Sequence, residues 1–202
     1  MFTRNYLKAF ALFILLLPVL ANAQKKEVSI RIVQEESVLL STYQTDIVLK
    51  KKSFKFQVFL DNVAGIYVFA AFSDSICCRL AELDSIAGFD DLPNRTMHEP
   101  NFNEDKELLV NDDNSCSYWF YSRGGNYQGF NRKVTLLDNG IVVAVKSVKQ
   151  LYHVPSQKEI KVKEIDQPLY LLFVAVSDFD KDGKPIKELM RRKVKIDWKK
   201  GD

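Results

Sequence analysis

The chain has 202 residues, of which 47% are hydrophobic, and its formal net charge is +3. This length is enough for one domain with a sizeable core. The near-neutral charge gives no electrostatic case for a nucleic-acid partner.

The first 23 residues have the three-part pattern of a secretory signal peptide. Arg4 and Lys8 form a positive start, an apolar run follows, and Ala21-Asn22-Ala23 is a small-residue cleavage site. The apolar run is shorter than the roughly 20 residues that span a membrane. We expect residues 1–23 to be removed and residues 24–202 to form one exported domain without a transmembrane segment, in the periplasm or outside the cell. The alternative is an uncleaved N-terminal anchor.

Along the chain, many short segments have the pattern of β-strands. Glu27 to Val33 alternates apolar and polar residues, which is typical of a half-buried strand. Phe54 to Leu60 predicts a strand with four large apolar residues on one face, and Leu189 to Trp198 ends in alternating apolar residues at Val194, Ile196 and Trp198. Gly65 to Phe72 and Leu169 to Val176 are almost entirely apolar, which favours central strands covered on both faces.

Residues 133–146 predict a β-hairpin folded at Asn139-Gly140, because this pair favours the positive φ angles of a two-residue type I′ turn. Such a turn would pair Leu137 with Val142 and Leu136 with Val143. Since side chains alternate along a strand, the hairpin would then have one wholly apolar face that packs on the core. That face consists of Val134, Leu136, Val143 and Val145.

Ser73 to Asp105 is a long irregular segment with several acids, a glycine and prolines. Ser75 to Ile86 has apolar residues at helical spacing and predicts one short helix there. Long loops on a rigid scaffold carry many binding sites, so we expect function in this segment and in the neighbouring strand Tyr118 to Tyr121.

Roughly nine strands with frequent turn signals and one helix predict an all-β fold. The expected architecture is a two-sheet antiparallel β-sandwich of Greek-key, immunoglobulin-like or jelly-roll type, with the short helix in the long irregular insertion.

Cys77, Cys78 and Cys116 are an odd number of cysteines for an exported chain. Adjacent cysteines are too close for an unstrained disulfide, because their Cα atoms are about 3.8 Å apart. A bridge would therefore join Cys77 or Cys78 to Cys116. The alternative is three reduced, buried thiols.

The segment from Asp178 to Gly183 begins like a calcium loop, with acids at Asp178, Asp180 and Asp182. The twelfth position of such a loop needs a bidentate glutamate, and Leu189 occupies it. No other cofactor is indicated, and an ordinary turn explains the same residues.

Trp119 and Tyr121 share one face of the predicted strand and could form a platform for a sugar or a protein partner. The alternative is that both faces of this strand are covered. His98 and Glu99 in the long insertion are further candidate ligand-binding residues, either for binding or for acid–base chemistry.

These observations favour an exported, non-catalytic β-sandwich protein that binds a protein, a glycan or an envelope component. The first alternative is an exported hydrolase that uses acidic or histidine residues of the 73–105 loop. The second is a structural subunit that pairs through a strand edge.

Overall fold

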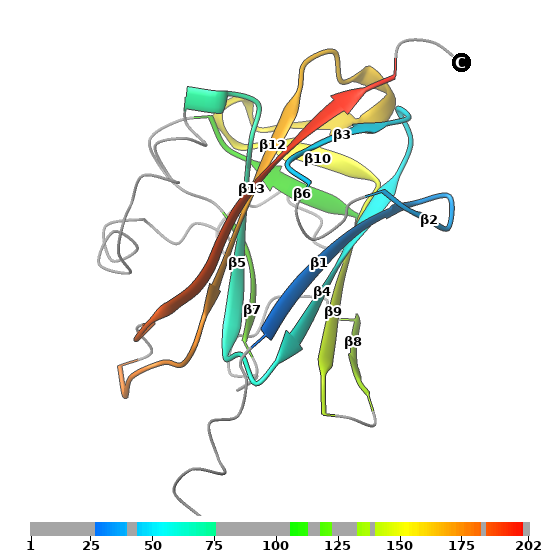
Figure 1. Cartoon of the computed structure of the whole chain (residues 1–202). Helices are drawn as coiled ribbons and strands as arrows, with labels where there is room; N and C mark the ends of the chain where they lie inside the picture. Colours follow the sequence, from blue (N-terminus) through cyan, green and yellow to red (C-terminus); the bar gives the residue numbers. More distant parts are fainter. Residues whose placement is uncertain are drawn as a thin grey trace, which may run out of the picture.

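The computed structural model describes residues 27–39, 44–75, 106–112, 118–122, 133–137, 140–182 and 185–199. Within these residues the chain forms strands and two short 3-10 helices, and Asp74 and Ser75 are helical (Figure 1). The strands are β1 (Glu27–Gln34), β2 (Ser37–Val38), β3 (Asp46–Leu49), β4 (Phe54–Asp61), β5 (Gly65–Ala71), β6 (Glu107–Val110), β7 (Tyr118–Ser122), β8 (Lys133–Leu136), β9 (Val142–Val148), β10 (Gln150–His153), β11 (Lys158–Lys161), β12 (Leu169–Val176) and β13 (Glu188–Trp198). The 3-10 helices are η1 (Val154–Ser156) and η2 (Val162–Glu164).

The described strands form three sheets. The first sheet has the order β2-β1-β4-β9-β8, the second β3-β13-β12-β5-β7, and the third β11-β10-β6. Most neighbours are antiparallel, but β3 runs parallel to β13 and β6 runs parallel to β10. The all-β prediction is confirmed, and the third sheet and the two parallel pairs are features beyond the expected two-sheet pattern.

The core lies where the first and second sheets face each other (Figure 1). In β4, Phe54, Phe56, Val58 and Leu60 alternate with more exposed residues and belong to the core cluster. Phe56 packs edge-on against Phe173 of β12, with ring centroids 5.6 Å apart. Alternation along β4 thus directs one row of large side chains to the second sheet.

The apolar runs of β5 and β12 are explained by their position inside the second sheet. They pair with each other, and every residue of β5 is buried. Val68 and Phe173 belong to the core cluster, whereas Tyr67 and Phe69 stack on the other face of β5 with ring centroids 6.5 Å apart. Both strands are buried on two sides, as predicted.

The predicted hairpin forms, but its two-residue turn is wrong. Leu136 pairs with Val142 and Thr135 with Val143, which is one residue away from the expected register. The Leu137 N–H donates to the Ile141 carbonyl, so the connection is a three-residue loop. Gly140 has φ +81°, and three-residue hairpin loops place a glycine in this left-handed region.

This shift changes which residues of β9 share a face with those of β8, because Val134 and Leu136 are now paired with Ala144 and Val142. The side chains of β8 lie outside the described part of the structure, so the core position expected for Val134 and Leu136 stays a prediction. Val142 and Ala144 belong to the core cluster, whereas Val143 and Val145 lie on the opposite face of β9. Lys146 is also buried on the core side. The expectation that Val143 and Val145 belong to the core between the two sheets is therefore wrong, although Val143 itself is buried and Val145 is half-buried.

Two segments that the sequence assigned lie outside the described residues. They are the leader 1–23 and nearly all of the expected helix from Ser75 to Ile86. Within the part of the chain that the structure describes, no helix is long and apolar enough to cross a membrane.

Candidate functional site

A tight reversal at the end of β1 builds the candidate site. Gln34 pairs with Ser37, so Glu35 and Glu36 alone make the turn into β2. Their φ angles are 49° and 67°. Positive φ at both central residues is the requirement of a type I′ turn, which usually contains asparagine or glycine. Two glutamates in this conformation carry backbone strain, and such strain is concentrated at functional sites.

The Gln34 side chain fixes the neighbouring loop to this turn. Its amide nitrogen donates to the carbonyls of Lys50, Lys52 and Ser53 at 3.0, 3.1 and 3.4 Å. Its amide oxygen accepts the Lys50 N–H at 2.8 Å. Because Gln34 is buried, these bonds satisfy backbone groups that water reaches poorly, and they hold the loop in one place.

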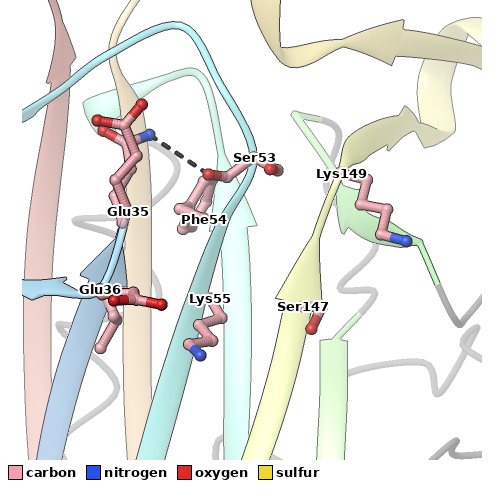
Figure 2. A pocket seen from close by; sticks show the side chains of 9 residues that line it. Glu35, Glu36, Ser53, Phe54, Lys55, Ser147 and Lys149 are labelled. Atoms are coloured by element: carbon pink, nitrogen blue, oxygen red, sulfur yellow. Dashed lines mark hydrogen bonds between the residues drawn. The ribbon is translucent and has the colours of Figure 1, made fainter.

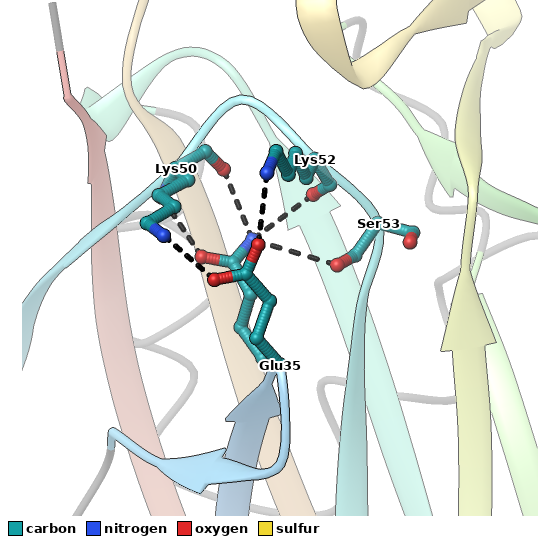
Figure 3. Close-up of polar contacts among 5 residues, drawn as sticks. Glu35, Lys50, Lys52 and Ser53 are labelled. Atoms are coloured by element: carbon teal, nitrogen blue, oxygen red, sulfur yellow. Dashed lines mark hydrogen bonds and ion pairs between the residues drawn. The ribbon is translucent and has the colours of Figure 1, made fainter. Parts of the chain in front are cut away.

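Glu35 lies between two lysines of the same loop (Figure 3). Its carboxylate is 2.7 Å from Lys50 Nζ and 2.9 Å from Lys52 Nζ. The hydrogen bonds from Lys50 and then Lys52 lower the pKa of Glu35 from 4.5 to about 2. Glu35 is therefore ionised at neutral pH and its charge is neutralised locally.

Beside this turn is a small open pocket of about 220 Å³, here called the turn pocket (Figure 2). The strand register sets its walls, because Val33, Lys55 and Ser147 are directly opposite one another across β1, β4 and β9. Its lining residues are Val33, Gln34, Glu35, Glu36, Ser53, Phe54, Lys55, Ser147 and Lys149.

Most polar side chains of the turn pocket are available to a ligand. Within the described residues, the side chains of Glu36, Lys55 and Lys149 form no ion pair or hydrogen bond, and the same holds for the hydroxyls of Ser53 and Ser147. Figure 2 shows Glu36 and Lys55 on one side of the pocket, with Ser147 on the neighbouring strand β9 and Lys149 just beyond the end of that strand. The site therefore offers acceptors and donors on a fixed frame.

A second polar cluster joins the ends of β6 and β10. Asp112 Oδ2 is 3.3 Å from His153 Nε2, and His153 Nδ1 is 2.8 Å from Ser156 Oγ. Asp112 Oδ1 accepts the N–H groups of Phe72 and Ser73, both at 2.8 Å. The connectivity resembles a nucleophile, base and orienting acid. However, Ser156 is exposed and lies three residues from His153 within one 3-10 turn, so local geometry also explains the contact.

The structure describes the three acids of the candidate calcium loop, and it does not bring them together. Asp178 accepts the N–H of Phe179, and Asp180 accepts the N–H of Asp182. In the described part of the chain, no group of three or more metal-ligating side chains occurs. The carboxylates serve local turn hydrogen bonds, which is a common use of aspartate.

The aromatic strand is an edge strand of the second sheet. In β7, Trp119 pairs with Val68 and Tyr121 pairs with Ile66. Val68 and Ile66 belong to the core cluster, and directly paired positions share a face of the sheet. The side chains of β7 lie outside the described part of the structure, so the platform at Trp119 and Tyr121 stays a prediction.

The remaining predicted site residues lie outside the described residues. They are His98, Glu99, Cys77, Cys78 and Cys116. Their roles as ligands or as a disulfide stay predictions.

The sequence carries one local sign of the turn at Glu35 and Glu36. Gln34-Glu35-Glu36 interrupts an alternating strand and is followed by a basic run, Lys50 to Lys52. A basic run of this kind is typical of a solvated turn before a strand, and in the structure it forms the bend between β3 and β4. Its pairing with Glu35 depends on a contact 15 residues away, which local patterns do not encode.

No protein family, curated protein or solved structure matches this chain in comparisons of sequence and structure.

Proposed function

We propose that the protein is an exported β-sandwich module that binds a small polar ligand, such as part of a glycan or of an envelope component, in the turn pocket. One observation carries this proposal. The turn pocket combines charged and hydroxyl side chains that have no partner within the described ranges with a frame held by Gln34 and the Glu35 ion pairs. A few fixed polar groups in a concave site are what orient small ligands.

Ligand-observed NMR with a panel of mono- and disaccharides and short peptides tests the proposal. Ser147→Trp should fill the pocket and abolish binding. Ser29→Trp is the matched control, because Ser29 is also a partly exposed serine of the first sheet and does not line the pocket. Hits that survive Ser147→Trp would place binding elsewhere.

Export is part of the same proposal and is supported by the pattern of the first 23 residues. Intact-mass measurement of the protein from its native host checks it. We expect a chain that begins at Gln24, and mature material that begins at Met1 would contradict export with cleavage.

A hydrolase is the second candidate, and the contacts among Asp112, His153 and Ser156 favour it. An active-site serine would react with a fluorophosphonate probe: Ser156 Oγ would bond to phosphorus, fluoride would leave, and His153 would accept the hydroxyl proton. We expect no labelling of the wild type. Labelling that Ser156→Ala removes would support the hydrolase instead.

A further inference from the structure

The turn pocket carries two ammonium groups that have no carboxylate partner among the described residues. Lys55 is directly opposite Ser147, and Lys149 is two residues beyond Ser147, one residue past the end of β9. The two lysines thus come from neighbouring strands on either side of the pocket, and both line it. Two positive charges without a carboxylate partner in the described chain would be neutralised by a bound anion.

Other side chains of the turn pocket favour a ligand that carries hydroxyl groups as well as a negative charge. Glu36 also lines the pocket, and its carboxylate repels a bare anion but accepts hydrogen bonds from hydroxyl groups. Ser53 and Ser147 add two hydroxyls that can both donate and accept. The ligand therefore needs a negative group on one side and several hydroxyl groups on the other.

The size of the pocket limits the ligand. Its volume of about 220 Å³ is below the range of roughly 300–1,000 Å³ found for drug-sized ligands. This volume suits a single sugar ring. Lys149 extends away from Lys55 in Figure 2, so it would have to change rotamer to contact the same group. Exposed side chains make such changes in picoseconds to nanoseconds.

We infer that the ligand of the turn pocket is an acidic saccharide. Its carboxylate binds between Lys55 and Lys149, and its ring hydroxyls bind Glu36 and the two serines. This inference rests on the proposed binding function and specifies the ligand class of the same site.

Titration of the ¹⁵N-labelled protein with D-glucuronate, D-glucose and acetate tests it, with backbone amide shifts of Ser147 and Lys149 as the readout. We expect glucuronate to bind at least fivefold more tightly than glucose or acetate, with a dissociation constant on the order of millimolar. Lys55→Gln and Lys149→Gln should each weaken glucuronate about two- to fivefold. Lys158→Gln is the control, because Lys158 is an exposed lysine of β11 in another sheet.

The outcomes separate this inference from the proposed function. If glucose bound as tightly as glucuronate, the inference of an acidic ligand would be wrong, and the proposal that the pocket binds a sugar would be supported. If acetate bound as tightly as glucuronate, the inferred role of the ring hydroxyl groups would be wrong. If only peptides from the panel shift these amides, the saccharide is wrong and binding in the pocket stands. If no ligand shifts them, both proposals fail.

Discussion

Asp112 and His153 connect two strands that run parallel, with Asp112 Oδ2 3.3 Å from His153 Nε2. The other Asp112 oxygen accepts two backbone N–H groups at the end of β5, from Phe72 and Ser73. One carboxylate therefore ties the third sheet to the second sheet, at the point where the chain enters the long insertion.

The backbone bonds of Asp112 give the first prediction. Asp112→Ala removes the acceptor for two N–H groups and should lower the free energy of unfolding by about 1–3 kcal/mol. Asp112→Asn keeps an acceptor oxygen and should cost less than half as much. Urea unfolding measures both. Equal losses would show that the contact with His153, and not the backbone anchoring, provides the stabilisation.

The second prediction concerns the frame of the turn pocket. Gln34→Ala removes a buried amide that bonds the Lys50 N–H and three carbonyls, so we expect a loss of about 1–3 kcal/mol in the free energy of unfolding. Gln44→Ala is the control, because the Gln44 amide makes an exposed bond to Asp46 and its loss should change stability by under about 0.5 kcal/mol. Similar losses for the two variants would contradict the anchoring role of Gln34.

Strand periodicity predicted the central strands β4, β5 and β12 of the first and second sheets well, because these strands have strong patterns. β5 and β12 are buried on both faces and read as apolar runs. β4 faces the core on one side only and reads as strict alternation. In each case burial is dictated by the side chains of the strand itself.

The prediction of the hairpin's turn and of its core face was wrong for two physical reasons. Asn139-Gly140 suits a two-residue turn, but a three-residue loop that ends at Gly140 uses the same glycine at φ +81°. In addition, the face of β9 that carries Lys146 is less apolar in sequence than the face that carries Val143 and Val145, so the sequence favoured the latter as the core face. A lysine can bury its aliphatic stem, and Lys146 lies on the core side with Val142 and Ala144.

The candidate site was predictable only in part. The sequence marks Glu35-Glu36 as an interruption of a strand. It contains no sign that Lys55 of β4 and Lys149 beyond β9 flank one pocket, because that depends on register between strands distant in sequence. The two-residue turn with positive φ expected at Asn139-Gly140 occurs instead at these two glutamates.

A third prediction follows from the depressed pKa of Glu35. Because its pKa falls from 4.5 to about 2 on folding, the ion pairs with Lys50 and Lys52 stabilise the fold above pH 4.5, and this contribution is lost as the pH falls to 2. Glu35→Gln should therefore flatten the decline in stability between pH 4.5 and 2. Denaturant unfolding across this range measures it. Glu36→Gln, at a residue without an ion-pair partner in the described chain, should leave the decline as in the wild type.

A fourth prediction tests whether the strained turn is kept for binding. Glu36 has φ 67°, and glycine adopts this angle without the steric cost of a side chain. Glycine relieves this strain but also adds entropy to the unfolded chain, which opposes folding. The net effect of Glu36→Gly should be a rise of about 0.5–2 kcal/mol in the free energy of unfolding. The same variant should weaken glucuronate, since it removes an acceptor. Glu159→Gly, in strand β11, should instead destabilise the fold by about 0.5–1 kcal/mol.

The last prediction concerns the register of the hairpin between β8 and β9. Thr135 is paired with Val143, and the two-residue turn would have paired it with Ala144. Directly paired residues on antiparallel strands have Cα atoms about 4.5–5.5 Å apart and Cβ atoms on one face, which suits a disulfide. Thr135→Cys with Val143→Cys should therefore cross-link under mild oxidation. Thr135→Cys with Ala144→Cys should not, because adjacent residues of a strand point to opposite faces. Proteolysis and mass spectrometry identify the linked peptides and separate them from any bridge among the three native cysteines. A cross-link in the Ala144 variant alone would restore the two-residue turn and return Val143 and Val145 to the core.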